Sequence, residues 1–270
     1  MKVGLYILGL ATIAAGVLDF VWGEFEPAHQ PIQAWGDHIP HQHMLAYVTA
    51  GWLVVAGATL LWRRTARTGA FAIAIVYLAF ALFWLPRFYT APLVLGAHAA
   101  IYISVLAGLC TQLIVVAAAT IVFCGLDDDP SRQPVVGYIV RLIFGIGSLS
   151  FGLAHLTGAQ ANAPMVPRWL PLGQIFWVDL TGCAFVLAGL AILTGVLDVL
   201  ASRLLALMLL VFSILSLIPA IVAAPHQHVP WGANAYNLAA VGAVWIFAEW
   251  LASLRHESKA IEKAPALQLS

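Results

Sequence analysis

The sequence is poor in charge. Asp, Glu, Lys and Arg together make up only 9% of its 270 residues, whereas hydrophobic residues make up 62%. A soluble globular chain carries about 25% charged and about 45–50% apolar residues. This small number of ionisable groups cannot cover the surface of a water-soluble protein of this size. The apolar surface must therefore be solvated by lipid. The sequence therefore predicts an integral membrane protein.

Other patterns that would indicate a function are also absent. The 12 basic residues balance 12 acidic ones and are scattered along the chain, so no basic patch is present to attract a nucleic acid. The three cysteines form no Cys-x-x-Cys pair, which argues against a dithiol redox centre. The chain contains neither a Gly-rich phosphate loop nor a Cys-x-x-Cys-His haem attachment motif.

Long apolar runs, by contrast, recur along the whole chain. A helix rises about 1.5 Å per residue, so about 20 apolar residues are needed to cross a hydrocarbon core of about 30 Å. The predicted spans are Val3–Trp22, Met44–Trp62, Gly69–Leu85, Val94–Cys124, Val135–Leu156, Leu172–Leu193, Leu204–Ala224 and Ala235–Leu254. The expected fold class is therefore all-α, with about eight transmembrane helices.

The basic residues predict how these helices are oriented. If the N-terminus lies inside, ten of the 12 Lys and Arg residues fall on the inner side, and only Arg87 and Arg168 fall outside. Cytoplasmic segments of multi-pass proteins carry such an excess of Lys and Arg. We therefore expect a multi-pass protein of the plasma or inner membrane with both termini in the cytoplasm.

The chain also repeats itself. Leu5–Phe20 aligns with Arg141–Leu156, and each segment carries two glycines, seven residues apart, in register. Glycines at this spacing share one helix face and suit close helix packing. A second block aligns Gly51 with Gly182.

The repeat divides the chain into two halves of about four helices each. We place them at residues 1–126 and 135–256, followed by a cytoplasmic tail at 257–270. An even number of helices makes both halves point the same way, so an axis along the membrane normal should relate them, as in parallel repeats.

The second half carries the motifs Gly152–Leu156, Val166–Pro171, Phe176–Gly182, Ala188–Gly195 and Arg203–Met208. Together these motifs resemble the DoxX-like family of small four-helix membrane proteins. The resemblance covers roughly residues 140–252 and implies a four-helix bundle, here duplicated. The chain departs from many relatives in having Phe185 where they carry a His or an acid about three residues after the Thr-Gly pair.

The resemblance also implies a function, because the family includes the membrane subunit of a thiosulfate:quinone oxidoreductase. We expect a membrane subunit associated with redox chemistry at the outer face, with a quinone as one candidate cofactor and with other membrane or redox subunits as partners besides the lipid bilayer. A non-catalytic scaffold or assembly subunit and a small-molecule transporter are the alternatives. Whether the chain is itself an enzyme stays open.

Histidines are concentrated in the predicted outer loops, where the motif Pro-His-Gln-His occurs twice. Imidazole is a common ligand for transition metals and haem iron, and a His-x-His pair in an extended loop places both rings on one side. The candidate metal ligands are His41, His43, His226 and His228, with Glu24, Glu26 and His98 as possible neighbours. The other interpretations are a haem held between helices and histidines that merely bind headgroups at the interface.

Ionisable residues within the apolar runs form a second candidate site, because each costs about 2.5–3.5 kcal/mol at the bilayer centre. Asp179 lies about two turns below the outer end of its helix, close in depth to His155, which aligns with Asp19. We expect Asp19, His155 and Asp179 to face the interior, and His155 and Asp179 to share a polar contact or a water-filled pocket. A polar contact without function is the alternative. Arg141 and Asp198 lie near the inner face and are expected to snorkel or pair.

Overall fold

The computed structural model describes residues 2–26, 29, 41–125 and 133–263. Every regular element in these ranges is helical. Eight of the described spans are long and apolar enough to cross a membrane. The predicted all-α class and the predicted number of spans are therefore confirmed.

The helices follow the predicted segments closely. They are α1 (Lys2–Trp22), α3 (Gln42–Leu61), α4 (Ala66–Trp84), α5 (Arg87–Leu95), α6 (Ala99–Cys124), α7 (Gln133–Thr157), α8 (Ala159–Asn162), the 3-10 turn η1 (Ala163–Met165), α9 (Gln174–Thr194), α10 (Asp198–Phe212), the π-helical segment η2 (Ser213–Leu217), α11 (Ile218–Ala223) and α12 (His228–Lys263). The elements α10, η2 and α11 form one continuous span. Three spans depart from the prediction. The span predicted from Leu204 starts at Asp198, and the one predicted over Ala235–Leu254 runs from His228 to Lys263, so His228 lies in a helix and not in a loop. The span predicted from Val94 starts only at Ala99, because Gly96 adopts a φ of 90° and separates it from the short helix α5.

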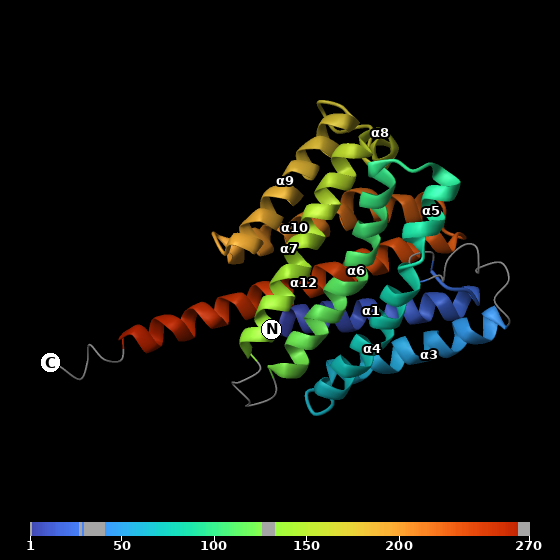
Figure 1. Ribbon diagram of the computed structural model, residues 1–270. Coiled ribbons are helices and arrows are strands. Elements are labelled where there is room, and N and C mark those ends of the chain that lie inside the picture. The colour runs from blue at the N-terminus through green and yellow to red at the C-terminus, as the bar shows by residue number, and fades with distance from the viewer. Residues whose placement is uncertain (1, 27–28, 30–40, 126–132, 264–270) are drawn as a thin grey trace.

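The long helices pack in chain order around a closed ring. Each packs on the next, from α1 on α3 through to α10 on α12, and α12 then packs on α1. The two most buried spans, α6 and α12, also touch each other across the ring, and α12 runs through the bundle and continues beyond it toward the C-terminus (Figure 1). Side chains also join α7 to α12, since the rings of Phe144 and Phe247 stack with centroids 4.2 Å apart. The first helix of each predicted half therefore packs on the last helix of the other half.

Glycines set the closest helix crossings. A Cβ atom on Gly57 would lie 2.7 Å from the carbonyl oxygen of Gly9, and one on Gly189 would lie 2.8 Å from that of Gly145. Real Cβ atoms do not approach a backbone oxygen so closely, so only glycine fits at these points. The predicted packing role of Gly9 and Gly145 is confirmed, and α1 crosses α3 much as α7 crosses α9.

The second block of the sequence alignment is wrong by one residue. A Cβ atom on Gly16 would lie 2.6 Å from the carbonyl oxygen of Ala50, and one on Gly152 would lie 2.7 Å from that of Gly182. Ala50 therefore occupies the place of Gly182, whereas Gly51 has no neighbour within 4 Å. A shift of one residue turns a side chain by about 100° around a helix, which is why Gly51 faces away from the crossing.

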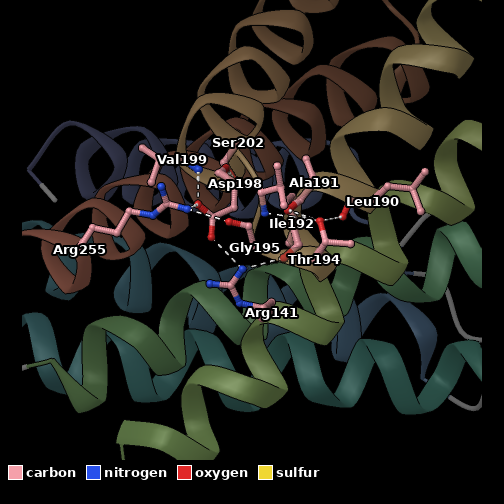
Figure 2. A network of polar contacts seen from close by, with 11 residues as sticks. Arg141, Leu190, Ala191, Ile192, Thr194, Gly195, Asp198, Val199, Ser202 and Arg255 are labelled. Atoms are coloured by element: carbon pink, nitrogen blue, oxygen red, sulfur yellow. Dashed lines mark hydrogen bonds and ion pairs between the residues drawn. The ribbon is translucent and has the colours of Figure 1, made fainter. Parts of the chain in front are cut away.

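An ion-pair network around the buried Asp198 closes one end of the second half (Figure 2). The carboxylate of Asp198, which is 1% exposed, accepts a hydrogen bond of 2.8 Å from Arg141 of α7 and another from Arg255 of α12. The same guanidinium groups donate to the carbonyl oxygens of Ile192 at 2.7 Å and Gly195 at 2.8 Å. The expected pairing of Arg141 with Asp198 is confirmed, and it ties α7, α9, α10 and α12 together.

Candidate functional site

Ionisable side chains gather where α1 ends and α12 begins, at the opposite end of the bundle, which we call the His228 end. The cluster consists of Asp19, Glu24, Glu26, His29 and His228. It combines one predicted intramembrane residue, Asp19, with one predicted metal ligand, His228, and both predicted neighbouring acids. From the sequence, His29 is only one of several histidines in the predicted outer loops.

His228, the first residue of α12, lies between two carboxylates. Its Nε2 atom is 3.4 Å from Oδ1 of Asp19, and its Nδ1 atom is 3.4 Å from Oε1 of Glu24. Its ring stacks on Trp22, with centroids 4.9 Å apart and an interplanar angle of 5°. The two carboxylates differ in environment, because the Asp19 side chain is fully buried whereas that of Glu24 is 47% exposed.

Asp19 lies in the last turn of α1 and is only partly satisfied. Its Oδ1 atom accepts a hydrogen bond of 3.0 Å from the backbone N–H of Glu26, because the chain folds back after α1. Its Oδ2 atom is buried and has no hydrogen-bond partner among the described residues. An unpaired oxygen of this kind is costly to bury, so it favours a proton, a water molecule or a ligand at this place.

Small residues bring the segment after α1 into position. Gly23 adopts a φ of 67°, which turns the chain at the end of α1. The Nδ1–H of His43 donates a hydrogen bond of 2.6 Å to the carbonyl oxygen of Gly23. Gly232 in the first turn of α12 lies directly against the side chain of Glu26, in space that a Cβ atom would fill. The Glu26 side chain is thereby buried beside α12.

His29 is buried among aromatic rings. It stacks on Phe80, with centroids 4.2 Å apart and an interplanar angle of 12°, and meets Tyr77 edge-on at 5.6 Å and Tyr236 at 6.2 Å. Neither ring nitrogen has a hydrogen-bond partner among the described residues. Burial lowers the pKa of His29 to about 4. The Asp19 carboxylate acts in the opposite direction, and His228 lowers the pKa of His29 slightly further. His29 is therefore neutral at neutral pH.

Arg87 adds a cation at the edge of the cluster. Its guanidinium lies over the ring of Trp84, 3.7 Å from the centroid. Burial lowers the pKa of Arg87, and the nearby Glu26 and Tyr236 act in the opposite direction. Because an arginine keeps its proton in a protein, Arg87 supplies a fixed positive charge next to the buried acids.

The other predicted metal ligands, His41, His43 and His226, are exposed and form no ion pair with His228 among the described residues, and the predicted neighbour His98 is exposed as well. Pro40 of the first Pro-His-Gln-His motif lies outside the described residues. Within the described part of the chain, no group of three or more His, Cys, Asp or Glu side chains has the geometry to hold a metal ion. A metal at the histidine loops stays a prediction.

The predicted His155–Asp179 site has a different character. Both side chains are half-buried, on the packed helices α7 and α9. The Nδ1–H of His155 donates to the carbonyl oxygen of Phe151 at 2.8 Å, and its ring lies 5.2 Å from that of Phe185. No hydrogen bond or ion pair joins His155 to Asp179 in the described structure, and Asp19, the counterpart of His155, pairs with His228 instead.

A small cavity lies within the bundle, and none of the five cluster residues lines it. It has a volume of about 70 Å³ and lies between α6, α7, α9, α10 and α12. Tyr236 links the cluster to the cavity, since its ring contacts His29 and it also lines the cavity together with Thr111, Ser148 and Asn237.

Asn237 donates hydrogen bonds of 2.8 Å to the carbonyl oxygen of Leu209 and to the hydroxyl of Ser213, where the π-helical segment begins. π-helical turns often mark functional positions.

Comparison with family models, with curated proteins and with solved structures gave no match. The functional argument therefore depends on the geometry of the His228 end. Sequence reasoning missed the aromatic rings around His29. The one local signal for them is the spacing of Tyr77 and Phe80, which lie three residues apart and so share a face of α4.

Proposed function

We propose that this chain is a membrane subunit of DoxX-like type that serves redox chemistry by binding a quinone at the His228 end. The observation that carries the proposal is the buried, neutral His29, whose ring nitrogens have no partner among the described residues. A quinone presents two carbonyl oxygens that accept hydrogen bonds and a flat ring that packs against aromatic side chains. The rings of Tyr77, Phe80 and Tyr236 supply such surroundings.

The acids of the cluster suit the same chemistry. Reduction of a quinone to a quinol takes up two electrons and two protons. The electrons would come from a partner redox subunit, and the protons from groups such as Asp19 and His228, which lie 3.4 Å apart beside His29. Asp19 also has a buried oxygen, Oδ2, that is free to receive a proton.

We further infer that the chain arose by duplication of a four-helix unit and that its halves run parallel. The support is the equivalence of the helix crossings: Gly9 meets Gly57 as Gly145 meets Gly189. The excess of basic residues on one side supports a plasma or inner membrane location with both termini cytoplasmic and the His228 end outside.

Quinone binding tests the proposed function. The protein in lipid nanodiscs is titrated with a short-chain ubiquinone and with a short-chain naphthoquinone, and quenching of tryptophan fluorescence reports binding. Trp22 and Trp84 flank the site. We expect saturable quenching by one of the two quinones and, for His29→Phe, an affinity about fivefold lower, since one hydrogen bond is worth about 1 kcal/mol.

His226→Phe is the matched control, because His226 is exposed and makes no contact with the cluster. It should leave quinone binding unchanged. Non-saturable quenching by both quinones, or equal affinity of His29→Phe and the parent, would remove the redox proposal and favour the non-catalytic scaffold.

A further inference from the structure

We propose that Glu24, His228 and Asp19 form a proton relay that connects the aqueous surface at the His228 end with the buried interior of the bundle. This inference does not depend on quinone binding, because it concerns how a proton reaches Asp19. It starts from three facts: Glu24 is half-exposed, Asp19 is fully buried, and one imidazole ring lies 3.4 Å from each of them.

The two contacts use the two different ring nitrogens. Glu24 faces Nδ1, and Asp19 faces Nε2. A neutral imidazole carries a proton on one nitrogen and a lone pair on the other, so it can accept a proton on one side and donate one on the other. Contacts on both nitrogens are what a relay needs, whereas a single ion pair would use only one of them.

The transfer is balanced without any further reactant. Glu24 takes a proton from solution and gives it to Nδ1 of His228, while the proton on Nε2 passes to Asp19. The ring changes from the Nε2–H to the Nδ1–H tautomer and keeps its charge, and the reverse transfer restores it. The stack on Trp22 holds the plane of the imidazole. Neither ring nitrogen makes a hydrogen bond within the described residues, so each 3.4 Å contact must shorten for a proton to pass.

At the exposed side, the ring of His43 hydrogen-bonds the carbonyl oxygen of Gly23, next to Glu24. Five further charged or titratable groups lie around the relay. They are Glu26 in the segment after α1, His29, Arg87 of α5, Tyr77 of α4 and Tyr236 of α12. Glu26 is buried and its backbone N–H binds Asp19, so it does not offer a second exposed route. Glu24 is thus the exposed carboxylate in contact with His228.

Infrared spectroscopy after a rapid fall in pH tests the relay. The full-length protein in nanodiscs is followed at the carboxyl C=O stretch, and the band that is present in the parent and missing in Asp19→Asn belongs to Asp19. We expect His228→Phe, which keeps the ring stacked on Trp22, to slow the appearance of this band at least tenfold. Glu24→Gln should slow it as well, and the exposed His226→Phe should not.

Two outcomes would overturn the proposal. One is an Asp19 band that rises in His228→Phe as fast as in the parent. The other is a parent protein in which Asp19 never protonates. If His228→Phe does not fold, Glu24→Gln decides, because its side chain lies at the surface and its replacement leaves the bundle intact. An unchanged rate in Glu24→Gln would then refute the relay.

Discussion

Acid should destabilise this protein through His29, and the size of the effect follows from its burial. The pKa of His29 is about 4 in the folded state, against about 6.5 for an unperturbed histidine. Between these two values the unfolded chain binds a proton that the folded chain does not, so stability is lost as the pH falls below the unfolded pKa. Between about pH 7 and about pH 5 this group alone should lower the free energy of unfolding by about 2 kcal/mol.

The variant His29→Phe isolates this contribution. A phenyl ring keeps the stack on Phe80 and has no proton to gain, so the variant should lose about 2 kcal/mol less than the parent over the same pH range. In thermal unfolding of the detergent-solubilised protein this corresponds to about 4–8 °C. Every other titrating group is common to both proteins and cancels in the comparison. Equal acid sensitivity of parent and variant would show that His29 is not buried in a neutral state.

Three further predictions concern the fold. Asp198→Ala leaves two arginines without their shared carboxylate and should destabilise the protein by about 3 kcal/mol in thermal or denaturant unfolding; a cost below about 1 kcal/mol would contradict the buried network. Gly189→Ala should cost about 1–3 kcal/mol because its Cβ atom meets the α7 backbone, whereas the control Gly51→Ala, which meets nothing, should be neutral or gain up to about 1 kcal/mol. Gln227→Cys, in a background without the native cysteines, should react with an impermeant thiol reagent in intact cells; labelling only after lysis would reverse the orientation.

The helices were predictable because crossing a bilayer is a local property of the sequence. Any run of about 20 apolar residues satisfies its backbone hydrogen bonds as a helix, whatever lies next to it. The same local reasoning found the glycine faces of α1 and α7. It failed at Gly51, because an alignment of two apolar helices can shift by one residue without any visible mismatch in hydropathy.

The candidate site was predicted in pieces, since its members come together only through tertiary packing. The sequence singled out Asp19, Glu24, Glu26 and His228, but it assigned them to two different sites. Nothing local shows that the last helix returns to the end of the first and brings His228 to Asp19. The burial of His29 was equally hidden, because a histidine in a polar loop looks the same whether it faces headgroups or aromatic rings.

The closed ring of helices also has a consequence for assembly in the membrane. The first helix packs on the last one, more than 200 residues later in the chain. Such a contact cannot form until synthesis and insertion are nearly complete, so the face of α1 that packs on α12 stays uncovered until then. Asp19 and His228 can therefore meet only at a late stage of assembly. An incompletely inserted chain carries the acids of the cluster without the histidine that joins them, so the site is complete only when the last helix is in place.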